Sequence, residues 1–103
     1  MINNEDQSRA GTPRQDSRYQ ANPDAVYNRL GDSAVVVNMR TNRIYELNRT
    51  GARFWELLCA GHDLEKLQQL MLQEFDVTES ELAIEIEAML ASLQKEGLIE
   101  EAS

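Results

Sequence analysis

The feature that most constrains the fold of this chain is a change of hydrophobic period at Asn48. Residues 43–47 read Arg-Ile-Tyr-Glu-Leu, in which successive side chains alternate between two faces, as in a strand. Residues 49–59 instead carry Phe54, Trp55, Leu57 and Leu58 at helical spacing. Since Asn is a favoured N-cap, the sequence predicts a short strand that leads directly into an amphipathic helix.

Two further strand patterns precede this junction. Residues 25–30 and the β-branched run 33–38 have strand character, and Gly31 with Asp32 separates them as a tight turn. Residues 39–42 form the next turn, where Asn42 tolerates an unusual φ. The chain therefore predicts a very small sheet that ends at residues 43–47. Such an edge strand has unpaired N–H and C=O groups, which can bind another extended peptide.

Two more helices follow. Asp63 is the expected N-cap of a helix that runs to about Phe75, and Thr78 begins a third helix, with Glu81 completing a capping box. The third helix is expected to run to about Glu96 and to stop at Gly97. The order of elements predicts an α+β fold, with a three-stranded antiparallel sheet followed by three helices.

The third predicted helix has two apolar stripes. At about 100° per residue, the broad core face consists of Leu82, Ala83, Ile86, Met89, Leu90 and Leu93. A narrower arc nearly opposite consists of Ile84, Ala88 and Ala91. This arc has two interpretations: a surface against which a partner packs, or an alanine-rich helix with one exposed isoleucine.

The N-terminal part of the chain differs in composition from the rest. Residues 1–22 are polar and lack any periodicity, so we expect a disordered arm, with a single domain over residues 23–100. No stretch of eighteen apolar residues and no signal-peptide pattern occurs, which argues against a membrane protein. The single cysteine, Cys59, excludes an intramolecular disulfide and favours a cytoplasmic location.

Charge and motif content exclude several functions. The net charge is −8, and from Arg49 onward four basic residues stand against twelve acidic ones, so nucleic-acid binding is not expected. His62 is the only histidine, and it has no neighbours at metal-ligand spacing. Because no triad, phosphate loop or Cys pair is present, we predict no catalytic residue, no metal and no cofactor, and hence no enzyme.

The segment Tyr45–Leu58, then Gly61, Phe75-Asp76-Val77 and residues 90–99, resembles the PqqD-like family of leader-peptide-binding modules, known as RiPP recognition elements. The pattern Tyr-x-Leu-Asn-x-Thr-Gly-Ala at residues 45–52 is the most specific part. Residues 51–55 are closer to the general and lasso-peptide-associated members. The turn at residues 38–42 lacks the Pro-Glu-Gly-like sequence of the strict pyrroloquinoline quinone subgroup.

This resemblance implies a winged-helix-like fold and a non-catalytic function. The leader of a precursor peptide would add as a strand beside the third strand, rest on the third helix, and be presented to a modifying or processing enzyme, such as a radical-SAM enzyme, cyclase or peptidase. The positions that match the family's binding residues are Arg43, Ile44, Tyr45, Glu46, Leu47, Glu81, Ile84, Glu85 and Ala88.

Two alternatives stand beside this interpretation. The open sheet edge could pair with a second copy of the chain and give a homodimer or a self-associating scaffold. A winged helix could also serve a DNA-binding regulator, although the ten residues from Thr78 include four glutamates.

Overall fold

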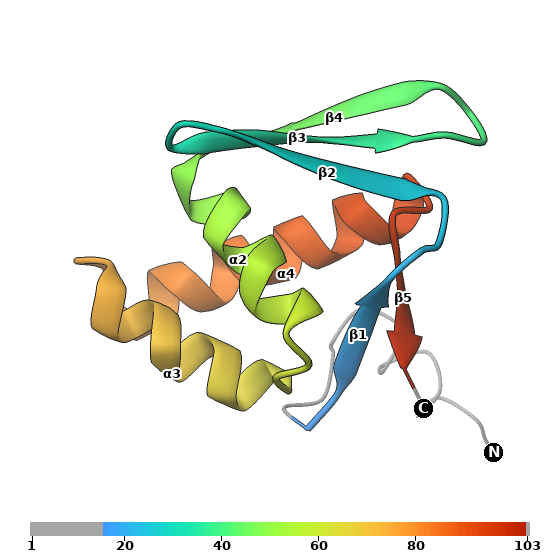
Figure 1. Cartoon of the computed structure of the whole chain (residues 1–103). Coiled ribbons are helices and arrows are strands. Elements are labelled where there is room, and N and C mark those ends of the chain that lie inside the picture. Colours follow the sequence, from blue (N-terminus) through green and yellow to red (C-terminus); the bar gives the residue numbers. More distant parts are fainter. Residues whose placement is uncertain (1–15, 103) are drawn as a thin grey trace, which may run out of the picture.

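The computed structural model describes residues 16–102 and has a three-stranded antiparallel sheet followed by three helices, which confirms the predicted fold class. Figure 1 shows the sheet lying over the helices, with α4 running behind α2. A second sheet of two short strands lies beside them. The elements are β1 (Arg18–Ala21), β2 (Ala25–Leu30), β3 (Ser33–Asn38), β4 (Arg43–Leu47), α2 (Arg49–Cys59), α3 (Leu64–Glu74), α4 (Glu79–Lys95) and β5 (Ile99–Ala102).

The larger sheet has the order β2-β3-β4, and its register assigns the side chains to two faces. Val36 pairs with Tyr27 on one side and with Tyr45 on the other, and this row faces the helices, since Val36 is completely buried. The neighbouring row, Val26–Val37–Ile44, lies on the outer face.

The three helices begin at the predicted caps. The side chains of Asn48, Asp63 and Thr78 accept hydrogen bonds from the backbone N–H groups of Gly51, Lys66 and Glu81. Each cap satisfies a donor that has no partner within its helix, so the polar residues in the sequence fix where the helices start.

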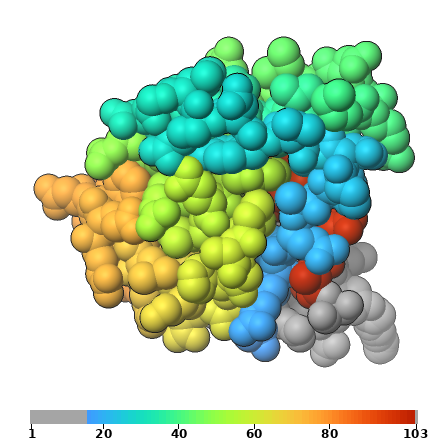
Figure 2. All heavy atoms as spheres, viewed as in Figure 1, coloured from blue at the N-terminus to red at the C-terminus, as the bar shows by residue number. Residues whose placement is uncertain are grey.

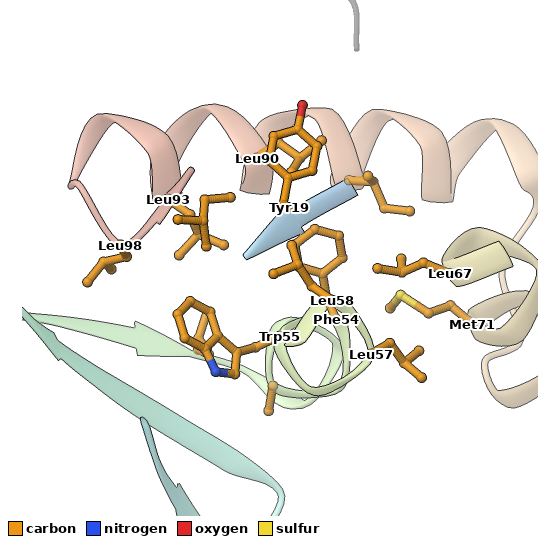
Figure 3. Close-up of a cluster of buried hydrophobic side chains, with 14 of the residues drawn as sticks. Tyr19, Phe54, Trp55, Leu57, Leu58, Leu67, Met71, Leu90, Leu93 and Leu98 are labelled. Atoms are coloured by element: carbon orange, nitrogen blue, oxygen red, sulfur yellow. The ribbon is translucent and has the colours of Figure 1, made fainter. Parts of the chain in front are cut away.

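The core lies between the sheet and the three helices. Figure 3 shows Phe54 and Leu58 of α2 packing toward Leu67 and Met71 of α3, while Tyr19 of β1 lies toward Leu90 of α4. In the space-filling view of Figure 2, the atoms of α2 fill the region between the sheet and α3. This packing holds α4 at a fixed position below the sheet.

The second sheet corrects the expectation of disorder up to residue 22. Residues 18–21 form β1, which pairs with β5 in antiparallel register from Arg18↔Ala102 to Ala21↔Ile99. Tyr19 is only 7% exposed and belongs to the core. The strand could not be predicted from the sequence, because its single buried aromatic residue gives no periodic pattern and its partner strand lies about eighty residues away. Residues 1–15 of the predicted arm lie outside the described residues.

Replacing the buried aromatic of β1 tests whether this segment belongs to the folded domain. We expect Tyr19→Ala to lower the free energy of unfolding by about 3 kcal/mol, as for other large core aromatics. Gln20→Ala, an exposed change in the same strand, should alter it by less than about 0.5 kcal/mol. Urea unfolding followed by circular dichroism measures the stability of both variants. Equal stability would contradict the assignment of Tyr19 to the core.

A network of polar side chains fastens the β2 edge of the sheet to the helices. The hydroxyl of Tyr27 donates a hydrogen bond to Glu56 on α2 at 2.7 Å, and Arg29 also contacts that carboxylate. Arg53 joins Glu56 to Glu74 on α3, with 2.8 Å between Nε of Arg53 and Oε1 of Glu74. The hydrogen bond from Tyr27, followed by that from Arg29, lowers the pKa of Glu56 from its usual value.

Because the pKa of Glu56 is lowered in the folded state, the free energy of unfolding depends on pH. A carboxylate whose pKa is lower in the folded state stabilises the protein above its unfolded pKa of about 4.3, and the contribution is lost as pH falls through the folded pKa. Glu56→Gln should therefore reduce the unfolding free energy at pH 7 and flatten its decline below about pH 4.3. Glu65→Gln is the control, since Glu65 is exposed and outside the network. Identical acid profiles of Glu56→Gln and the unmodified protein would contradict the assignment.

Candidate functional site

The strand β4 lies at one edge of the larger sheet. It pairs with β3 on one side, and no other strand within residues 16–102 pairs with its second side. The backbone groups along that side are therefore available to a further strand. The predicted edge strand is thus at an edge in the structure.

A shallow hollow of about 150 Å³ lies beside this edge, between β4 and α4. The strand and the turn after it form one wall, and α4 forms the other. The lining residues are Tyr45, Glu46, Leu47, Asn48, Gly51, Glu85 and Met89. An extended chain placed on the free edge of β4 would lie over this hollow and could direct alternate side chains into it.

Away from the hollow, near the start of β4, the sheet contacts the end of α4. Asn38 is 3% exposed, and its amide nitrogen donates to the backbone carbonyl of Glu96 at 3.0 Å. Its amide oxygen accepts from the backbone N–H of Arg40 at 3.0 Å, which holds the turn before β4. Arg43 adds a two-pronged ion pair with the Glu96 carboxylate, at 2.8 and 3.1 Å.

Gly97 lies beside Asn38 at the turn that follows α4. Its φ is +72°, which disfavours any residue with a side chain, and a Cβ atom there would lie 3.4 Å from the amide nitrogen of Asn38. The sheet is thus attached to α4 at the Asn38–Glu96 end, and the hollow lies further along, toward Leu47.

The strand residues predicted to bind peptide fall into three environments. Tyr45 is half-buried and Leu47 is buried, so both contribute to the core as well as to the hollow. Ile44 is 66% exposed on the outer face of the sheet, where Glu46 also directs its side chain by strand alternation. The guanidinium of Arg43 lies in the ion pair with Glu96.

The predicted helix residues do not all face β4. Glu85 lines the hollow, whereas Glu81, Ile84 and Ala88 are exposed and are not among its lining residues. Ile84 is 70% exposed, on the side of α4 opposite its buried residues. The carboxylate of Glu81 accepts a hydrogen bond from the backbone N–H of Thr78 at 3.1 Å, so it completes the predicted capping box.

Three residues of the hollow were not predicted as site residues. Met89 was assigned to the core face of the helix, but it is half-buried and lines the hollow. Its spacing of four from Glu85 is the signal that would have placed both on one flank of α4. Asn48 was predicted as the helix cap, and both Asn48 and Gly51 belong to the family pattern at residues 45–52, but neither was predicted to bind peptide. A Cβ atom on Gly51 would lie 3.1 Å from Cδ2 of Leu47, so glycine keeps this corner of the hollow open.

The remaining features of the described residues concern metal binding, the cysteine and membrane-spanning helices. Within residues 16–102, no group of three or more His, Cys, Asp or Glu side chains is arranged to hold a metal ion. Cys59 is exposed at the end of α2. None of the helices formed by residues 16–102 combines the length and the apolar character that crossing a bilayer requires.

The fold and the open sheet edge define a small α+β domain with a strand-and-helix groove. A profile of the family described as "Coenzyme PQQ synthesis protein D (PqqD)" matches residues 33–99. Since this match covers more than half of the 103 residues, the chain belongs to the PqqD family. No curated protein sequence matches the chain significantly.

Two solved structures share the fold. A chain of "TbiB1 in Complex with the TbiA(beta) Leader Peptide" superposes with a TM-score of 0.74 at 22% identity, covering 79% of this chain and 94% of that one. "Lasso peptide synthetase B1 complexed with the leader peptide" gives a TM-score of 0.73 at 22% identity, covering 81% and 98%. The chain therefore spans nearly the whole of both relatives.

The attachment of the sheet to α4 can be tested by mutation. We expect Asn38→Ala to lower the free energy of unfolding by about 1–3 kcal/mol, because the backbone carbonyl of Glu96 and the N–H of Arg40 each lose a partner in a partly buried region. Asn28→Ala is the matched control, since Asn28 is exposed on β2 and should change stability by less than about 0.5 kcal/mol. Chemical denaturation measures both, and an unchanged Asn38→Ala protein would refute the proposed attachment.

Proposed function

We propose that this protein binds the leader segment of a precursor peptide at the free edge of β4, and that it has no catalytic activity of its own. The observation that carries the proposal is the unpaired edge of β4 beside the hollow against α4. Two structures of the same fold are described as complexes with a leader peptide, which supports leader binding as the function.

The energetics of strand addition fit a specific but reversible complex. Each backbone hydrogen bond contributes about 0.5–1.5 kcal/mol net, and the side chains that enter the hollow add apolar burial against Leu47 and Met89. Ordering a flexible leader costs roughly 2–5 kcal/mol. Several paired residues with two apolar anchors would then give micromolar affinity, near −8 kcal/mol.

The nine predicted residues would contribute to leader binding in different ways. Arg43 to Leu47 would present the backbone edge, and Glu85 would form part of the opposite wall. Ile84 and Ala88, on the exposed side of α4, would contact only the parts of a leader that extend beyond the hollow. Glu81 would act mainly through the helix cap.

Presentation to a second protein completes the proposed role. The bound leader would bring the rest of the precursor to a modifying or processing enzyme in the cytoplasm, in peptide natural-product or related cofactor biosynthesis. A radical-SAM enzyme, cyclase or peptidase would suit that role. A DNA-binding function is disfavoured because the exposed acids of α4 repel phosphate. Homodimer formation through a free sheet edge is the remaining alternative, and sedimentation across a concentration series distinguishes it.

A titration followed by NMR tests the proposal. The probe is the leader of a short precursor encoded beside this gene, added to ¹⁵N-labelled protein. We expect the largest shifts at the amides of residues 43–47 and at the flank of α4 that carries Glu85 and Met89. Shifts confined to other elements, or no shifts at millimolar leader, would refute the proposal.

A matched pair of truncations tests the hollow itself. Met89→Ala should weaken leader binding roughly five- to thirtyfold, because about 1–2 kcal/mol of apolar contact with the peptide is lost. Leu72→Ala is the control, since Leu72 is also half-buried but lines a different groove, between α3 and α4. Isothermal titration calorimetry measures both affinities, and an equal effect of the two changes would place the leader elsewhere.

A further inference from the structure

Two glutamates beside the free edge of β4 have no partner. Among the described residues, neither Glu46 nor Glu85 takes part in a hydrogen bond or an ion pair through its side chain. By contrast, Glu56, Glu74 and Glu96 are each paired with an arginine. The acidic groups left without a counter-charge by the fold thus include two at the candidate site.

These two carboxylates would meet different sides of an added strand. Glu85 belongs to α4 and lines the hollow, so it faces side chains directed toward the helix. Glu46 also borders the hollow, but strand alternation places its side chain on the outer face of the sheet with Ile44, so it faces side chains directed away from the helix. A strand beside β4 would therefore pass one acid on each of its faces.

The same geometry specifies where apolar side chains belong. Ile44 is exposed on the outer face and offers an apolar cross-strand contact, while Leu47, Tyr45 and Met89 offer one inside the hollow. A side chain that covered Glu46 or Glu85 without pairing with it would remove water from the carboxylate without replacing the lost hydrogen bonds, which weakens binding. An acidic side chain would be repelled as well.

On this basis, and resting on the proposed function, we infer that the bound leader segment is a basic, amphipathic strand. It has a Lys or Arg that pairs with Glu46 on its outer face, two positions from an apolar residue beside Ile44. Its helix-facing side has apolar residues in the hollow and a second Lys or Arg that pairs with Glu85. The two glutamates are specificity-determining residues that select basic leaders and reject acidic ones.

The test uses three synthetic twelve-residue peptides with the same neutral fluorophore. All three peptides have the same Ile and Leu residues, in alternation, at their apolar positions. They differ only at two other positions, one on each face of the strand, which are Lys in the first peptide, Gln in the second and Glu in the third. Dissociation constants are measured by fluorescence anisotropy at 50 and 300 mM NaCl. At low salt, the Lys peptide should bind about fivefold to tenfold more tightly than the Gln peptide, since each exposed ion pair contributes a few-fold. This preference should shrink at 300 mM NaCl.

Charge-matched variants separate local pairing from the general attraction of an acidic protein. The double variant Glu46→Gln with Glu85→Gln should bind the Lys and Gln peptides equally. The control, Glu65→Gln with Glu87→Gln, removes the same charge from exposed positions away from the hollow and should keep the preference.

The outcomes distinguish this inference from the proposed function. Equal binding of the three peptides, or a preference that survives in the Glu46 and Glu85 double variant, overturns the charge rule and leaves strand addition intact. If no synthetic peptide binds while the genomic leader shifts the β4 amides, the charge rule alone is overturned. If neither binds, both proposals fail.

Discussion

The candidate site depends on how the sheet is attached to α4, and this attachment rests on one buried asparagine. Asn38 uses its amide nitrogen to bind the last turn of α4 and its amide oxygen to hold the turn that leads into β4. Together with the ion pair between Arg43 and Glu96, this side chain attaches the start of the edge strand to the end of the helix. These contacts lie at one end of the strand and helix, and the hollow lies toward the other end, where Leu47 and Met89 are among its lining residues.

Local signals in the sequence were sufficient for most of the fold. The strand ranges 25–30, 33–38 and 43–47 match β2, β3 and β4, and the caps at Asn48, Asp63 and Thr78 begin the helices where expected. These features are encoded by neighbouring residues: period, turn chemistry and capping side chains. The strands β1 and β5 were missed because their stability comes from pairing across the whole chain and from Tyr19 in the core.

The candidate site was only partly predictable for the same reason. Strand order made β4 an edge, and the family resemblance indicated α4 as the second wall, but the rotation of α4 depends on packing. Helical spacing placed Ala83 and Met89 together on the core face, whereas in the structure Ala83 is exposed toward α3 and Met89 lies toward β4. The partner of Arg43 is more than fifty residues away, at Glu96, and no local pattern links them.

The two edges of the larger sheet are not equivalent, and this has a consequence for stoichiometry. Tyr27 and Arg29 hold the β2 edge against Glu56 of α2, while the polar Asn28 and the charged Arg29 on that strand discourage pairing with another chain. The β4 edge has no comparable side-chain attachment along residues 44–47 within the described residues. Each molecule should therefore bind one extended ligand, at the β4 edge. Once that edge is occupied, copies of the protein could not stack edge to edge into open-ended assemblies.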